Sequence, residues 1–291
     1  MRRITWLASY PKSGNTWLRA IVDRIVRPER PFDLNALGET APAFSGLTEQ
    51  FIAKLGGAVP LSSRGEVRRY WAGAQHAICS SFEQEIFLKT HNVAAKFDCG
   101  YFPDPNSTKS VIYIVRDPRD VAISFAHHYR RPLREVVAVL CSSWAVNFKP
   151  QQMGRTELLT SWGEHVVGWT ALKQFPLLVL RYEDLLANGE AGVGRIAGFL
   201  GKQLSERQVK EVVAATSFGR LRRQEAERGF TEAVTAGGFF RVGKAQQWRQ
   251  VRDQSVFQPL LDRFSRLMRR YGYLERAERA LPRGGAPVAQ R

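Results

Sequence analysis

Short runs of apolar residues alternate along this chain with segments in which apolar residues recur at helical spacing. The first run, residues 4–8, ends at a loop that contains proline and glycine, which is typical of a buried strand. From Asn15 onward apolar residues recur every three or four positions until Pro28, and this spacing predicts a helix. The chain therefore opens with a strand, a loop and a helix.

The same order returns twice further along the chain. Residues 111–115 (VIYIV) form a second apolar run, after which Asp117 suits a helix N-cap and Pro118 suits the first helical turn. A third run at 177–180 is followed by acidic residues and another apolar segment. Strands that alternate with helices predict an α/β fold, with a mostly parallel sheet flanked by helices.

The rest of the chain gives weaker signals. Apolar positions between residues 257 and 271 mark one face of a long amphipathic helix. Residues 28–75 show no strong periodicity and contain several glycines and prolines, so we expect an irregular insertion there. Residues 278–291 are rich in Pro, Gly, Ala and Arg, and we expect a disordered tail. With no internal repeat or linker, we predict a single domain over residues 1–277.

The composition narrows the class of partner. The formal net charge is +16, but the positive residues are spread along the chain, which argues against nucleic acid and leaves a small polyanionic ligand. No apolar run reaches the roughly 18 residues of a membrane span, and the N-terminus lacks the pattern of a signal peptide. We therefore expect a cytoplasmic protein with no membrane partner. Three cysteines without metal-like spacing are expected to be free thiols.

Residues 10–17 (YPKSGNTW) connect the first strand to the first helix. A helix N-terminus attracts phosphate, Gly14 lets the backbone approach an anion, Ser13 and Thr16 add hydroxyl donors, and Lys12 adds a charge. The nucleotide-triphosphate loop instead ends in Gly-Lys-Ser/Thr, an order that is absent here. The segment is predicted to be a phosphate-binding loop, although, considered alone, it could be an ordinary strand-to-helix turn.

This loop resembles the 5′-phosphosulfate-binding loop of the sulfotransferases that use 3′-phosphoadenosine-5′-phosphosulfate (PAPS), of the cytosolic and bacterial small-molecule type. Further segments resemble the same family in the same order: LKTH at 88–91, IYIVRDPRDVAIS at 112–124, SWGEHVVGW at 161–169, RYED at 181–184, TSF at 216–218 and, more weakly, 239–249. The resemblance implies an enzyme that moves a sulfuryl group from PAPS to a hydroxyl or amine of a small-molecule acceptor. The product of the donor would be adenosine 3′,5′-bisphosphate (PAP).

The resemblance assigns catalysis to three residues. Lys12 would stabilise the charge that develops on the bridging oxygen, Lys89 would contact the sulfuryl oxygens, and His91 would be the general base. Without the resemblance, Lys12 could be a solvated surface residue. A histidine in an apolar setting is likewise more often structural than catalytic.

The donor contacts that the resemblance implies come from several segments: Lys12, Ser13, Gly14, Asn15 and Thr16 at the 5′-phosphate, Arg116 and Ser124 at the 3′-phosphate, Trp17, Tyr182, Thr216 and Phe218 around the adenine, and Arg241 and Gly243 in the last segment. Arg116 could instead pair with Asp117 or Asp120, and the aromatic residues could be core. Val242 stands where the family has lysine, and Gln246-Gln247 replace Gly-Asp, so Lys244 is a candidate substitute for the missing charge.

Two other function classes remain open at this stage. A small-molecule kinase would need a nucleotide-triphosphate loop and carboxylates for Mg²⁺, and neither is evident, so no metal site is predicted. A basic protein that binds anions or nucleic acid would explain the charge but not the Lys-Thr-His element. The acceptor is expected between the donor site and residues 28–75, with Phe82, His127 and Tyr129 as wall residues. The sequence leaves the acceptor and any oligomer open.

Overall fold

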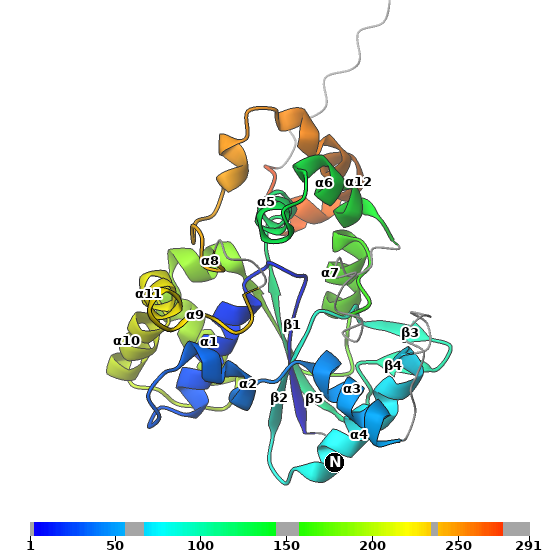
Figure 1. Ribbon diagram of the computed structural model, residues 1–291, viewed down its shortest axis with the longest axis vertical. Helices are drawn as coiled ribbons and strands as arrows, with labels where there is room; N and C mark the ends of the chain where they lie inside the picture. The colour runs from blue at the N-terminus through cyan, green and yellow to red at the C-terminus, as the bar shows by residue number, and fades with distance from the viewer. Residues whose placement is uncertain (1–2, 56–66, 144–156, 234–237, 276–291) are drawn as a thin grey trace, which may run out of the picture.

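The computed structural model describes residues 3–55, 67–143, 157–233 and 238–275, and is built on a four-stranded parallel sheet (Figure 1). The strand order in this sheet is β2-β1-β5-β6, and β3 and β4 form a separate antiparallel pair. The strands are β1 Ile4–Ser9, β2 Ile86–Thr90, β3 Ala95–Phe97, β4 Gly100–Phe102, β5 Thr108–Val115 and β6 Leu177–Arg181. The prediction of an α/β fold with a parallel sheet is confirmed.

Helices cover both faces of the sheet. One face packs against α1, α8, α9 and α10, and the other packs against α3 to α7 and α12, as the two sides of Figure 1 show. The helices are α1 Asn15–Val26, α2 Leu37–Thr40, α3 Phe44–Lys54, α4 Trp71–Ser81, α5 Pro118–Tyr129, α6 Leu133–Cys141, α7 Trp162–Thr170, α8 Tyr182–Ala187, α9 Gly189–Phe199, α10 Glu206–Ala215, α11 Phe218–Arg228 and α12 Gln258–Arg270. Short 3₁₀ helices are η1 Leu34–Ala36, η2 Val67–Tyr70, η3 Gln247–Gln250 and η4 Gln254–Phe257.

Strand β1 sets the register of the sheet because it lies between β2 and β5. Ala8 is opposite Thr90 of β2 and opposite Tyr113 of β5. Since the three strands are parallel, their carboxyl ends reach the same edge of the sheet. The segments that follow them, which begin at residues 10, 91 and 116, therefore leave from neighbouring points.

The start of α5 and the end of α1 are set by residues that the sequence already identifies as helix caps and helix breakers. Asp117 caps α5, since its carboxylate accepts a hydrogen bond from the Arg119 amide at 2.9 Å, and Pro118 occupies the first turn. Helix α1 ends at Val26, two residues before Pro28. These boundaries match the predicted ones to within a few residues.

The prediction of an irregular segment at residues 28–75 is wrong for the part that the structure describes. Helices α2 and α3 lie within it and α4 begins in it. Each helix has eleven residues or fewer. Buried apolar residues such as Phe44, Ile52 and Trp71 pack these helices against the core. Short helices depend on such tertiary packing, so their sequence periodicity is weak.

Two further predictions concern the ends of the chain and the membrane. The predicted tail, residues 278–291, lies outside the described residues. Within the described ranges, every helix is too short or too polar to cross a membrane.

Candidate active site

The loop after β1 presents the N-terminus of α1 to a cavity at the carboxyl edge of the sheet. Gly14 precedes α1 with φ of +105°, and a Cβ atom there would lie 2.8 Å from the Tyr182 ring. Asn15 fastens the start of the helix to the strand, because its side-chain amide donates to the Leu7 carbonyl at 2.9 Å and to Ser9 Oγ at 3.2 Å. The unpaired amides of the first helical turn are thus held beside the cavity.

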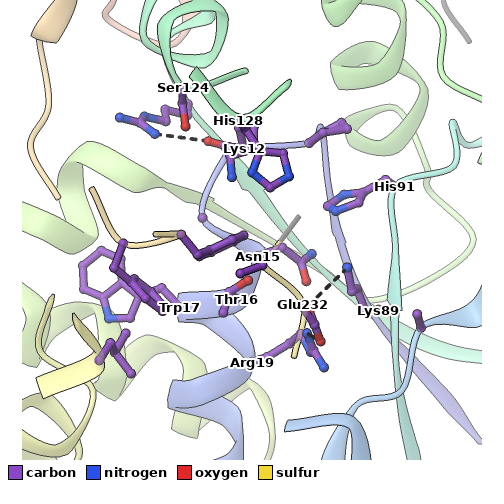
Figure 2. A pocket seen from close by; sticks show the side chains of 18 of the residues that line it. Lys12, Asn15, Thr16, Trp17, Arg19, Lys89, His91, Ser124, His128 and Glu232 are labelled. Atoms are coloured by element: carbon purple, nitrogen blue, oxygen red, sulfur yellow. Dashed lines mark hydrogen bonds and ion pairs between the residues drawn. The ribbon is translucent and has the colours of Figure 1, made fainter. Parts of the chain in front are cut away.

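The cavity has a volume of about 710 Å³, and Figure 2 shows part of its lining. Its walls include most of the residues that the sequence predicts for the site: Lys12, Gly14, Asn15, Thr16, Trp17, Lys89, His91, Arg116, Ser124, Tyr182, Phe218, Arg241 and Gly243. These residues come from segments that are far apart in the sequence. The fold brings them together around one space.

Ser13 and Thr216 are the predicted site residues that do not line the cavity. Ser13 is fully buried, and its hydroxyl has no hydrogen-bond partner among the described residues. The Thr216 hydroxyl donates to the Val212 carbonyl of α10 at 2.8 Å. A threonine hydroxyl bonded back to its own helix is not directed at a ligand, so the structure does not bring Thr216 to the adenine edge as expected.

His91 follows β2 and has a defined tautomer. Its Nδ1 is 2.8 Å from the Ser9 carbonyl, which can only accept, so Nδ1 carries the proton and Nε2 keeps a free lone pair. Burial and the neighbouring Lys89 charge lower the pKa of His91 from 6.5 to about 3. The imidazole is therefore neutral at physiological pH and has an acceptor atom available for a proton.

Side chains of helix α7 position His91 by hydrogen bonds to the backbone of residues 91 and 92. The sequence alone does not reveal this role. His165 Nε2 donates to the His91 carbonyl at 3.1 Å, and Trp169 Nε1 donates to the Asn92 carbonyl at 2.9 Å. The Tyr113 hydroxyl completes this network by donating to His165 Nδ1 at 2.9 Å. The spacing of four residues between His165 and Trp169 places both on one helix face, which is the signal that could have indicated a shared target.

Lys12 lies near two other cations of the cavity, Arg116 and Lys89. Burial, with Arg116 and Lys89 nearby, lowers the pKa of Lys12 from 10.5 to about 7. Its ammonium lies 4.0 Å from the centre of the Phe239 ring. Such an accumulation of positive charge is unfavourable without a ligand and suits an anion that brings several negative charges.

Arg116 connects three parts of the site. It donates to the Lys12 carbonyl at 3.1 Å and to the Lys244 carbonyl at 3.2 Å, and it lies 4.3 Å from the centre of the Tyr182 ring. The sequence alternative is partly present, since Arg116 is also 3.7 Å from Asp120. Its Nε has no hydrogen-bond partner among the described residues, which leaves a donor available for a phosphate.

The segment 239–249, called the closing segment below, forms the part of the cavity wall next to Phe218. Gly243 has φ of +63°, and a Cβ atom there would lie 2.2 Å from the Phe218 ring. Arg241 donates to the Gln247 side chain, and both residues line the cavity. Lys244 presents its carbonyl to Arg116, but it is exposed and is not part of the cavity lining. The structure thus gives no support to Lys244 as the substitute for the lysine that Val242 replaces.

Another part of the cavity wall is formed by the region 28–75. Its lining includes Pro42, Ala43, Ser45, Gly46, Leu47 and Gln50. The Lys89 amide donates to the Pro42 carbonyl at 2.9 Å, so this segment is fastened next to the Lys-Thr-His element. This wall lies where the acceptor is expected.

The expected acceptor wall is only partly correct. Tyr129 lines the cavity, but Phe82 is 52% exposed at the end of α4 and does not. In α5 the neighbouring His128 lines the cavity instead of His127. Adjacent helical residues point about 100° apart, so a prediction that is wrong by one residue selects the wrong face.

Among the residues that the structure describes, no group of three or more His, Cys, Asp or Glu side chains is arranged to hold a metal ion. The cavity lining is rich in cations, hydroxyl groups and aromatic rings, and it contains the buried His91. These groups suit an anionic, base-containing ligand.

Comparison with known proteins agrees with this chemistry. The family model described as "Sulfotransferase domain" matches residues 2–272. Bovine sulfotransferase 1A1 (Bos taurus) is 29% identical over 84% of this chain and 76% of its own length. Firefly luciferin sulfotransferase (Photinus pyralis) is 26% identical over 84% of this chain and 65% of its own length.

A solved structure shares the fold. Retinol dehydratase in complex with androsterone and inactive cofactor PAP superposes with a TM-score of 0.62 at 22% identity, over 92% of this chain and 81% of that one.

Proposed function

This chain belongs to the sulfotransferase domain family, and on that premise we propose that it transfers a sulfuryl group from PAPS to a hydroxyl or amine of a small-molecule acceptor and releases PAP. The observation that carries the proposal is the meeting of Lys12, Lys89 and His91 in one cavity with Arg116 and Ser124. Luciferin sulfotransferase is named for a small molecule, and the solved retinol dehydratase holds PAP and androsterone.

The reacting groups divide the work between a base and a cation. His91 takes the proton of the acceptor hydroxyl on Nε2 as the acceptor oxygen bonds to sulfur. Lys12 stabilises the electron pair that remains on the bridging oxygen of PAP when the bond from that oxygen to sulfur breaks. Lys89 contacts the oxygens of the sulfuryl group as it moves from PAPS to the acceptor. The interactions of Lys12 and Lys89 with the developing negative charge are strongest in the transition state, and this difference accelerates the transfer.

The two ends of the cavity have separate tasks in this proposal. Arg116, Ser124 and the aromatic rings of Trp17 and Phe218 hold the 3′-phosphate and the adenine. The wall from Pro42 to Gln50 with Tyr129 receives the acceptor. We also propose a cytoplasmic location, in keeping with the cytosolic type of small-molecule sulfotransferase that the sequence resembles.

Two experiments test the proposal. In thermal unfolding, PAP at a hundred times its dissociation constant should stabilise the protein by about 2.7 kcal/mol, and ATP at the same concentration by much less. Incubation with PAPS and a panel of phenols, alcohols and amines should then give a sulfated product in mass spectrometry.

Equal stabilisation by PAP and ATP would favour the kinase alternative. Affinity for nucleic acid with a steep salt dependence, without any effect of PAP, would favour a basic binding protein.

A further inference from the structure

One carboxylate lies among the cations of the cavity and has no role in the chemistry above. Glu232 Oε1 is 2.7 Å from Arg19 Nη1, and Glu232 Oε2 is 3.7 Å from Lys89 Nζ. Figure 2 shows Lys89 between His91 and Glu232, with Arg19 beyond the carboxylate. All four side chains line the cavity. The carboxylate is thus in direct reach of one of the three catalytic groups.

Arg19 holds Glu232 in place. The Arg19 side chain is 1% exposed, and it extends from α1 about one turn after the phosphate-binding loop. A buried guanidinium without a carboxylate partner would be strongly destabilising, so this ion pair is tightly specified. The backbone beside Glu232 is also fixed, because the Thr231 amide donates to Asn35 Oδ1 at 2.9 Å.

Lys89 needs such a partner because the nearby Lys12 ammonium repels it. Its long side chain has many rotamers, and its ammonium is close enough to Lys12 and His91 to lower the pKa of each. Repulsion from Lys12 alone would favour rotamers that turn Lys89 away from the reacting atoms. An attractive carboxylate on the other side of the ammonium opposes that movement.

The distances also leave Lys89 able to react. At 3.7 Å the contact with Glu232 is an ion pair without a direct hydrogen bond. The ammonium therefore keeps its N–H donors for the sulfuryl oxygens. The stronger, hydrogen-bonded contact of the carboxylate is the one with Arg19.

We propose that Glu232, fixed by Arg19, is a positioning residue that keeps the Lys89 ammonium beside His91 and the transferred group. This inference rests on the proposed function, since it assigns Lys89 to the sulfuryl oxygens. A positioning role predicts different effects on turnover and on donor binding. Because the Glu232 carboxylate repels an anionic donor, its removal should lower turnover without lowering the affinity for PAP.

The test uses the full chain and three variants: Glu232→Gln, Lys89→Met and the two combined. The glutamine keeps the size of the side chain and an oxygen for Arg19, but loses the charge that attracts Lys89. Turnover is measured as release of PAP from PAPS with 4-nitrophenol as the probe acceptor, which counts transfer to the phenol and to water. Affinity for PAP is measured by calorimetry.

We expect Glu232→Gln to lower turnover about tenfold, while the affinity for PAP stays within about threefold or becomes tighter. The combined variant should be no slower than Lys89→Met within about twofold, because Glu232 acts through Lys89. Unchanged turnover in Glu232→Gln, or losses that multiply in the combined variant, would overturn the inference. If the wild type bound no PAP and released none, the proposed function itself would fail.

Two further variants separate positioning from folding. Glu232→Asp keeps a negative charge for Arg19 but withdraws the carboxylate from Lys89 by about one methylene, and should show a smaller loss of turnover with the melting temperature preserved. It keeps the test valid if the glutamine variant fails to fold. Glu39→Gln is the matched control, because Glu39 lies 2.8 Å from Arg30 and 3.7 Å from Arg27 away from the cavity. Its turnover should equal that of the wild type.

Discussion

Lys89 lies near the carboxyl end of β2, Arg116 directly follows β5, and Lys12 lies in the loop after β1. Arg241 and Gly243, by contrast, precede η3 and belong to no helix or strand. The first group is fixed by backbone ladders, since the ends of β1, β2 and β5 are paired residue by residue. The segment 239–249 is fixed by side chains. Asp120 accepts from the Trp248 amide at 3.0 Å, and the Arg119 guanidinium lies 3.5 Å from the centre of the Trp248 ring.

This difference bears on the positions where the chain departs from the family pattern that its sequence resembles. The backbone ladder fixes the direction of a side chain at a paired strand end, while a connecting segment such as 239–249 tolerates substitution more readily. Val242 and Gln246-Gln247, the departures from the family pattern, all lie on the closing segment. We therefore expect large effects on turnover from the strand ends and smaller effects on donor affinity from the closing segment.

The largest effect is expected for His91→Ala at a strand end. Loss of the base should lower transfer to a hydroxyl acceptor by about 10²–10⁴-fold, with PAP affinity nearly unchanged. Turnover and calorimetry measure the two quantities. His127→Ala is the control, since His127 is nearby on α5 but outside the cavity lining. Full activity of His91→Ala at neutral pH would require another base.

The next effect concerns the charge of Lys12. Lys12→Met should lower turnover about 10²-fold, more than it weakens PAP binding, because the ammonium acts most strongly on the leaving oxygen. An exposed lysine, Lys202, is the control when it is replaced by methionine. Weaker PAP binding with unchanged turnover would make Lys12 a tether only.

The pH dependence of Lys12 gives a second measurement. Its pKa in the folded protein is about 7 and is 10.5 when unperturbed, so the unfolded state binds more protons between these values. Stability should therefore rise with pH across this window, and the rise should be smaller in Lys12→Met. Anionic PAP favours the charged form, so binding near pH 8 should take up about one proton. Calorimetry in two buffers of different ionisation enthalpy measures this uptake.

A moderate effect is expected for Gly243→Ala on the closing segment. The new Cβ would strike the Phe218 ring in a left-handed backbone conformation, and should weaken PAP binding about tenfold with little change in turnover at saturating PAPS. Gly201→Ala has nearly the same φ, +67°, but no atom within 4 Å of the new Cβ. It therefore measures backbone strain alone. Equal PAP affinity in both variants would remove Gly243 from the donor site.

The smallest effect is expected for Val242→Lys. A lysine at this half-buried position should add one charge-assisted contact to the 3′-phosphate and tighten PAP binding by about 1 kcal/mol, or fivefold, with a steeper salt dependence. Lys244→Ala should leave the affinity almost unchanged, because that side chain does not line the cavity. A large loss in Lys244→Ala would show that this lysine replaces the missing one.

The sequence by itself determined three strands of the sheet (β1, β5 and β6), the helices α1 and α5, and the loop at residues 10–17. These features depend on short-range causes: the period of apolar residues, Asp117 and Pro118 at a helix start, and Gly14 at a turn. The helices within residues 28–75 escaped prediction because contacts with the distant core stabilise them.

Only the tertiary structure decided which histidine has a free acceptor atom and what holds it. The tautomer of His91 depends on the Ser9 carbonyl, and its backbone position depends on His165, which lies far along the chain. The contact of Glu232 with Lys89 and Arg19 likewise joins three distant segments. Hydrogen bonds and ion pairs of this kind require atoms within about 4 Å, and residue spacing along the chain does not fix such distances across a folded core.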